Sequence, residues 1–186
     1  AARLASTLDV TGATSLASTF VVQGATSATG IIQAVGGIRF GTNTTDNLDN
    51  ILYGTWTPTF TPGNYTYNAQ TLGRYQRIGN LVYITAHLAI TGITSAGSGN
   101  LSVGGLPLTI SNLGNSPHSG ISFTYWGPLT LNTGFTYLGF QPTANTTTLL
   151  LLQSGSGLAP IAVSTGTLAS TTDFIFGGMY LTSITV

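Results

Sequence analysis

Few residues in this chain of 186 residues can do acid–base or nucleophilic chemistry, and the chain contains no cysteine and no glutamate. Its carboxylates are four aspartates: Asp9, Asp46, Asp49 and Asp173. Cleavage of a glycosidic bond normally uses two carboxylates about 5–10 Å apart. Three of these aspartates fall within the first 50 residues and the fourth lies near the other end. The order of the chain therefore brings no pair of carboxylates together.

The two histidines offer little more. His118, Ser119 and Asp173 can be combined on paper into a Ser–His–Asp set, but the sequence has no G-x-S-x-G elbow to present the serine. His87 falls in an expected strand, and two histidines without acids beside them in the sequence do not form a convincing metal site. We therefore expect no catalytic residue, no metal and no cofactor, and we predict that the chain is not an enzyme.

Carbohydrate binding is the chemistry that the residue types favour. Aromatic rings cover the apolar face of a sugar, and amide and hydroxyl groups hydrogen-bond its hydroxyls. The expected ligand-binding residues are Tyr65, Tyr67, His118, Tyr125, Trp126, Asn132 and Tyr137. Each aromatic could instead be an ordinary core residue, an alternative that applies above all to Trp126.

Composition limits the fold and the partners. Charged residues make up 4% of the chain and the net charge is zero, so four scattered arginines cannot form a nucleic-acid-binding surface. The 42% of hydrophobic residues argues against disorder. No apolar run reaches the ~18 residues needed to cross a bilayer, and no secretory signal pattern is present. Residues that favour strands are abundant, so the expected fold class is all-β.

A repeat with a step of 12 residues occupies the start of the chain. Gly12, Gly24 and Gly36 recur at this step, and each follows a short apolar-alternating segment. Such a segment cannot bury its apolar stripe alone. We expect three copies of the chain to wind into a stalk with these side chains at its axis: Leu8, Val10, Phe20, Val22 and Ile32. Alternatives are the first strands of a monomeric sandwich and a flexible tail.

Two domains follow from this pattern: a repetitive β-stalk and neck over residues 1–48 and a β-sandwich head, jelly-roll-like, over residues 49–186. Turn formers fill the neck, where Asp46 and Asp49 could hold calcium, although a solvated linker is the simpler interpretation. About nine or ten strands separated by Gly, Pro and Asn follow. The run Leu149–Leu152 does not alternate, which predicts a strand covered on both faces.

Several segments of the head resemble a known family. The segments 54–59 (GTWTPT), 73–82 (GRYQRIGNLV), 104–108 (GGLPL) and 173–180 (DFIFGGMY) are similar to the C-terminal heads of tail-fibre and receptor-binding proteins of bacteriophages and some large algal viruses. These are scaffold motifs, so no binding residue is transferred from them. Trp56 and Tyr75 are expected in the core, with their polar atoms hydrogen-bonded at its edge. Arg74 and Arg77 are expected on opposite faces of a strand, and two roles stay open for them: a pair with Asp173 across a subunit boundary, or a surface arginine without a partner.

The resemblance and the residue types lead to one expected function. The chain is predicted to be the receptor-binding head of a virion fibre, located on the virion surface, which attaches as a homotrimer to host cell-surface glycans. Its partners would be two further copies, the host carbohydrate and the rest of the fibre, with no nucleic acid and no membrane insertion. The alternative is a purely structural virion spacer or decoration protein without its own ligand.

Overall fold

The structure is a computed structural model that describes residues 38–39, 47–48, 51–112 and 119–183. The chain divides into two units, Ala1–Val35 and Gly36–Val186. The five expected stalk-axis residues and the neck aspartates lie outside the described residues, so the stalk, its trimeric axis and the boundary at residue 48 stay predictions. Before residue 51 the described residues form two short strands, β1 (Ile38–Arg39) and β2 (Asn47–Leu48), which pair antiparallel.

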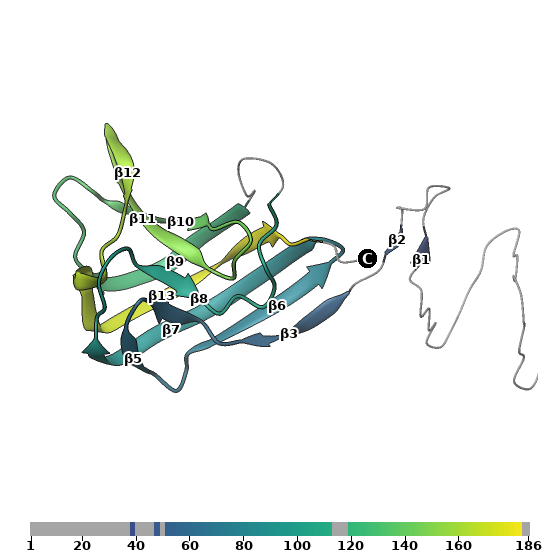
Figure 1. Ribbon diagram of the computed structural model, residues 1–186, viewed down its shortest axis with the longest axis horizontal. Helices are drawn as coiled ribbons and strands as arrows, with labels where there is room; N and C mark the ends of the chain where they lie inside the picture. Colours follow the sequence, from purple (N-terminus) through teal and green to yellow (C-terminus); the bar gives the residue numbers. More distant parts are fainter. Residues whose placement is uncertain (1–37, 40–46, 49–50, 113–118, 184–186) are drawn as a thin grey trace, which may run out of the picture. The chain divides into compact units, whose positions relative to one another are not determined.

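Two antiparallel sheets make up the part of the chain from residue 51 onward (Figure 1). The six-stranded sheet has the order β3-β6-β7-β13-β9, with β5 paired to a second stretch of β7. Its strands are β3 (Leu52–Trp56), β5 (Asn64–Tyr67), β6 (Leu72–Ile78), β7 (Leu81–Ser95), β9 (Ser119–Leu129) and β13 (Leu168–Leu181). The last strand, β13, drawn yellow, therefore lies between β7 and β9, although both of these strands are distant from it in the sequence.

The second sheet has five shorter strands in the order β10-β11-β8-β4, with β12 also paired to β11. These strands are β4 (Thr59–Thr61), β8 (Ser102–Gly104), β10 (Tyr137–Pro142), β11 (Leu149–Gly155) and β12 (Leu158–Ala162). A single 3₁₀ turn, η1 (Thr165–Thr167), precedes β13. No helix in the described part of the chain is long and apolar enough to span a membrane.

Alternating side chains explain why these strands form and how they pack. In β7, buried Val82, Ile84 and Ala86 alternate with exposed Tyr83 and Thr85, which is the period of a strand with one face in a core. The inner faces of both sheets supply one shared hydrophobic cluster. The all-β prediction is confirmed for the described residues. The arrangement of a stalk followed by a sandwich head stays a prediction.

Aromatic rings fill the centre of the core. Phe123 of β9 stacks on Phe140 of β10 with 4.4 Å between ring centroids, so the two sheets meet there. Phe174 and Phe176 of β13 pack edge-on or tilted against this pair. Edge-to-face and offset contacts between aromatic rings add to the free energy gained by burying their surface.

Two sequence predictions about the motif strands have definite outcomes. Trp56 is buried in the core as expected, but its indole N–H has no hydrogen-bond partner among the described residues, contrary to the prediction. The indole lies directly over Gly73, the first residue of the GRYQR segment, where any side chain would collide with it. Arg77 is buried and donates from Nε to the Gly79 carbonyl at 2.6 Å, whereas Arg74 is exposed on the opposite face.

Candidate binding surfaces

The solvent side of the six-stranded sheet, here called the outer face, carries large apolar side chains in rows across the strands. Strand register places Leu72, His87, Ile175 and Tyr125 side by side in one row, in that order across β6, β7, β13 and β9. A second row lies four residues further along β7 and β13. It contains the exposed Tyr83 and Met179, which face each other across these two strands. Both rows point to solvent because their strand neighbours point into the core.

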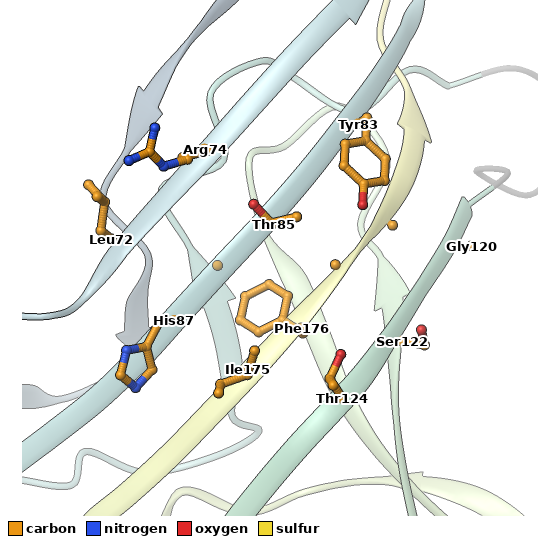
Figure 2. Close-up of a pocket in the computed structure, with 13 residues that line it drawn as sticks. Leu72, Arg74, Tyr83, Thr85, His87, Gly120, Ser122, Thr124, Ile175 and Phe176 are labelled. Carbon is orange, nitrogen blue, oxygen red and sulfur yellow. The ribbon is translucent and has the colours of Figure 1, made fainter.

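A trough of small and polar side chains separates these two rows. It contains Thr55, Arg74, Thr85, Gly177 and Ser122, one each from β3, β6, β7, β13 and β9. The missing side chain of Gly177 deepens it to a hollow of about 520 Å³ (Figure 2). A second hollow of about 510 Å³ continues toward Tyr53 and Tyr75. The trough offers one guanidinium and several hydroxyl groups between apolar walls.

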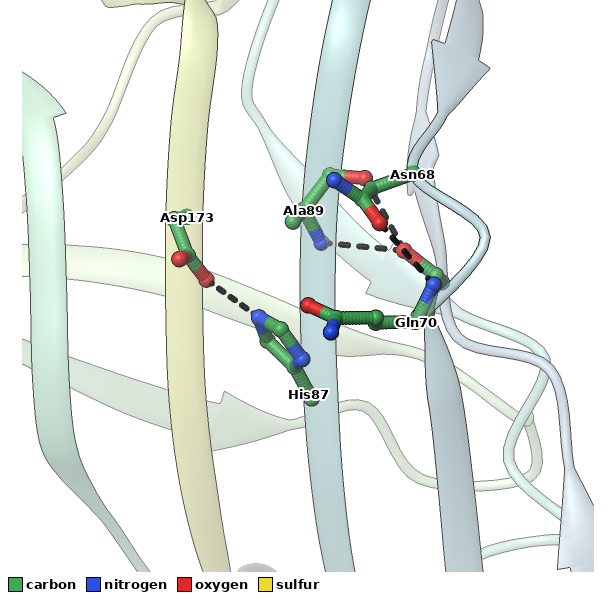
Figure 3. A network of polar contacts seen from close by, with 6 residues as sticks. Asn68, Gln70, His87, Ala89 and Asp173 are labelled. Carbon is green, nitrogen blue, oxygen red and sulfur yellow. Dashed lines mark hydrogen bonds and ion pairs between the residues drawn. The ribbon is translucent and has the colours of Figure 1, made fainter.

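An acid and an imidazole meet at the edge of the hollow. His87 Nε2 lies 2.8 Å from Asp173 Oδ1, and both side chains are about one-third exposed (Figure 3). Asp173 is the register partner of Ala89 on β7, so the pair spans β7 and β13 diagonally. Asp173 thus pairs with His87 of the same chain, while a pairing with an arginine of another copy stays a prediction.

Backbone contacts fix the strand segment beside this pair. Thr71 Oγ1 donates to the Ala89 carbonyl at 2.9 Å and accepts from the Ala89 N–H at 3.1 Å. Asn68 donates its backbone N–H to the same carbonyl and accepts from the Gln70 N–H through Oδ1, both at 2.9 Å. The loop before β6 is therefore tied to β7 next to His87 (Figure 3).

The structure brings two pairs of the seven predicted ligand-binding residues near each other: Asn132 and Tyr137 at one end of β11, and Tyr65 and Tyr67, whose ring centroids are 6.4 Å apart. Tyr137 is 69% exposed and lies opposite Ser154 in the register of β10 and β11. Asn132 donates its backbone N–H to the side-chain oxygen of buried Gln153 at 2.8 Å, which holds the loop before β10 against the same strand. We call Asn132, Tyr137 and Ser154, with the exposed threonines of this loop, the Tyr137 patch.

The neighbouring pair Tyr125 and Trp126 is divided between the two faces of the other sheet. Tyr125 is 51% exposed on the outer face, whereas Trp126 lies opposite buried Phe174 and packs against the core. Successive residues of a strand point to opposite faces, so a sequence pair of this kind cannot form one flat aromatic surface. His118, another of the seven predicted residues, lies outside the described residues.

Tyr65 and Tyr67 stand at the edge of the core, and their hydroxyl groups are bonded to the backbone. The Tyr65 hydroxyl donates to the carbonyls of Pro62 (2.8 Å) and Ala96 (3.0 Å), and the Tyr67 hydroxyl accepts from the Phe60 N–H at 2.8 Å. Burial raises the pKa of both phenols, and the Phe60 hydrogen bond opposes that rise at Tyr67. These bonds give both tyrosines a role in holding the loop after β4, while their role as ligand contacts stays a prediction.

Sequence reasoning missed the outer face. The signal was present in β7 and β13, where Leu81, Tyr83, Ile175 and Met179 occupy the positions that alternate with core residues. Strands that are apolar on both faces are expected to be covered on both. The sequence predicted a strand covered on both faces only for the run Leu149–Leu152 of β11, in the other sheet.

Comparison with known proteins gives one similarity of fold. No protein-family model matches the chain, and no curated protein matches it. The crystal structure of the Dettilon tailspike protein matches 74% of this chain with a TM-score of 0.56 and 23% sequence identity. The match covers 25% of the tailspike chain, so the present chain corresponds to about a quarter of that protein's length. At this identity the two proteins share a fold.

This comparison contradicts the prediction that the chain is not an enzyme. Tailspike proteins are often glycan-degrading enzymes, so the lack of a local motif does not support the conclusion that a chain with this fold is not an enzyme. His87 has no acid near it in the sequence. In the folded chain, however, Asp173, 86 residues away, lies 2.8 Å from it. Incubating the protein with host polysaccharide and measuring the length of the chains is the direct assay of such an activity.

Proposed function

We propose that this chain is the receptor-binding head of a virion tail fibre or tailspike, which attaches as a homotrimer to host cell-surface glycans. The observation that supports this most is the two-sheet fold shared over 74% of the chain with a tailspike protein. The resemblance of the GTWTPT and GRYQR segments to fibre heads points to the same class of protein. Both observations support a location at the outside of a virion.

The Tyr137 patch is the proposed site of glycan contact. Tyr137 presents a ring that is mostly exposed, and the side chain of Asn132, in the loop held against the same strand, is also exposed. A tyrosine ring can cover the apolar C–H face of a sugar while amide and hydroxyl groups bond its hydroxyls. The patch carries no charged residue, so it suits a neutral glycan better than a polyanion.

Trimerisation would raise the affinity of such a site. A single shallow sugar site binds weakly, but three sites on one particle raise avidity by roughly 10²–10⁴ when the geometry allows simultaneous contact.

We propose that the repeat at the start of the chain holds the three copies through Leu8, Val10, Phe20, Val22 and Ile32. Replacing Phe20 or Val22 with Asp is expected to weaken assembly, because three charges would meet near the axis. Sedimentation equilibrium of each variant measures this effect.

A glycan array probed with the full chain tests the proposed function. Tyr137→Ala should lower the signal on the glycans that the wild type binds by about tenfold or more, because avidity multiplies the loss at each site. Thr57→Ala is the control, since Thr57 is exposed in the connection between β3 and β4, outside the Tyr137 patch and the interfaces proposed here, and is expected to leave binding unchanged. Absence of signal from the wild type on every glycan would refute glycan attachment and favour the structural spacer. Equal loss in both variants would refute the assignment to the Tyr137 patch.

A further inference from the structure

The outer face exposes more apolar surface than an isolated protein normally shows. Among the described residues, eight of the 13 exposed large hydrophobic side chains belong to it. They are Tyr53, Leu72, Ile78, Leu81, Tyr83, Tyr125, Ile175 and Met179, with exposed fractions from 40% to 85%. At about half of some 200 Å² each, they present about 800 Å² of side-chain surface. The largest apolar patch of a typical monomer is about 300–600 Å².

This area matches what one partner contributes to a stable protein–protein interface. Such interfaces bury about 800 Å² on each side, with an apolar centre and a polar rim. Of the eight side chains, five are aliphatic or methionine, a composition that fits another protein surface better than a sugar. The ionisable groups on the face are Arg74 and the paired His87 and Asp173 at its margin.

The outer face is not flat but carries a trough between rows of protruding side chains. Its trough is floored by Gly177 and edged by Ser122 and Gly120, and it runs between rows of protruding side chains such as Tyr83 and Ile175. The chain has zero net charge, so copies do not repel one another electrostatically.

We infer that the outer face is an interface in which a second copy of this chain covers the rows of apolar side chains. The inference rests on the homotrimer of the proposed function and adds to it a contact outside the repeat, made by the six-stranded sheet itself. Covering the face would remove its apolar side chains from water, at about 25 cal/mol per Å² buried. The Tyr137 patch, on the other sheet, would stay open to solvent.

Single cysteines test this inference cleanly, because the chain has none of its own. Met179→Cys and Tyr83→Cys place a thiol on the outer face, where the native side chains are 46% and 48% exposed. Ile161→Cys is the matched control on β12, where the native side chain is 40% exposed. In an isolated copy all three thiols would react with a maleimide at similar rates. With the outer face covered, Cys at 179 and 83 should react at least tenfold more slowly than Cys at 161.

A photocross-linker identifies what covers the face. Benzoyl-phenylalanine in place of Tyr83 should yield, after irradiation of the full chain, a covalent product of twice the chain mass. The same group in place of Ile161 should yield much less of it. Equal thiol reactivity at the three positions would overturn the inference, and so would protection without any chain-to-chain product, because a segment of the same chain would then cover the face.

The two proposals fail in different experiments. If the thiols on the outer face react freely while the glycan array still gives a signal that depends on Tyr137, the contact between sheets is wrong and the attachment function stands. If the face is protected and cross-linked between copies but no glycan is bound, the interface stands and the protein is a structural component.

Discussion

Tyr180 provides the sharpest test of how the two sheets are held together. It lies on β13, is fully buried, and reaches the loop between β8 and β9. Its hydroxyl donates to the Leu108 carbonyl at 2.9 Å and accepts from the Leu108 N–H at 3.3 Å. Burial raises the pKa of this phenol from 10.0 to about 12, although the hydrogen bond with the Leu108 backbone lowers it in part.

This pKa shift predicts a loss of stability at alkaline pH. Below pH 10 the phenol is protonated in the folded and the unfolded chain, so it adds no pH dependence. Above pH 10 the unfolded chain releases the proton while the folded chain keeps it up to about pH 12, so the free energy of unfolding falls as pH rises. A difference of about two pKa units corresponds to a loss of about 2.7 kcal/mol by pH 12.

Comparison of the wild type with Tyr180→Phe isolates this contribution. At pH 8 the variant should be less stable by about 1–3 kcal/mol, because the peptide groups of Leu108 lose their buried partner. Between pH 10 and 12 the gap should close, since only the wild type carries the titrating group. Urea unfolding at fixed protein concentration, repeated from pH 8 to 12, measures both curves. Tyr65 and Tyr67 titrate in both proteins and cancel, so curves that remain parallel over this range would refute the reasoning.

Two further substitutions test the packing. Gly73→Ala should destabilise the protein by about 1–3 kcal/mol, because its methyl group would collide with the Trp56 indole. The control Gly139→Ala places its methyl group in open space and should leave the thermal midpoint nearly unchanged. Equal shifts of the thermal midpoint in both variants would contradict the packing at Gly73. Thr172→Val should lower the free energy of unfolding in urea by about 1–3 kcal/mol, because the fully buried Thr172 hydroxyl donates to the Pro128 carbonyl at 2.7 Å. An unchanged free energy of unfolding would show that this hydrogen bond is dispensable.

The arrangement of the outer face shows why surface function was harder to predict than strand content. Tyr83 and Met179 are 96 residues apart in the sequence and become neighbours only because β13 pairs with β7. His87 and Asp173 meet for the same reason. Pairing of distant strands depends on the whole core, so the local pattern carries no record of it. Asn132 and Tyr137, in contrast, are close in sequence and remain close in the structure.

The sequence by itself determined that this protein is built from strands, and it placed Trp56 in their core. Alternation of apolar and polar residues acts over a few residues and survives in any arrangement of the sheets. Only the tertiary structure decided which strands are neighbours, and with them the outer face, the pairing of His87 with Asp173 and the separation of Tyr125 from Tyr137. The physical reason is that strand order is set by burying one shared core of aromatic and aliphatic side chains, a property of the folded chain as a whole.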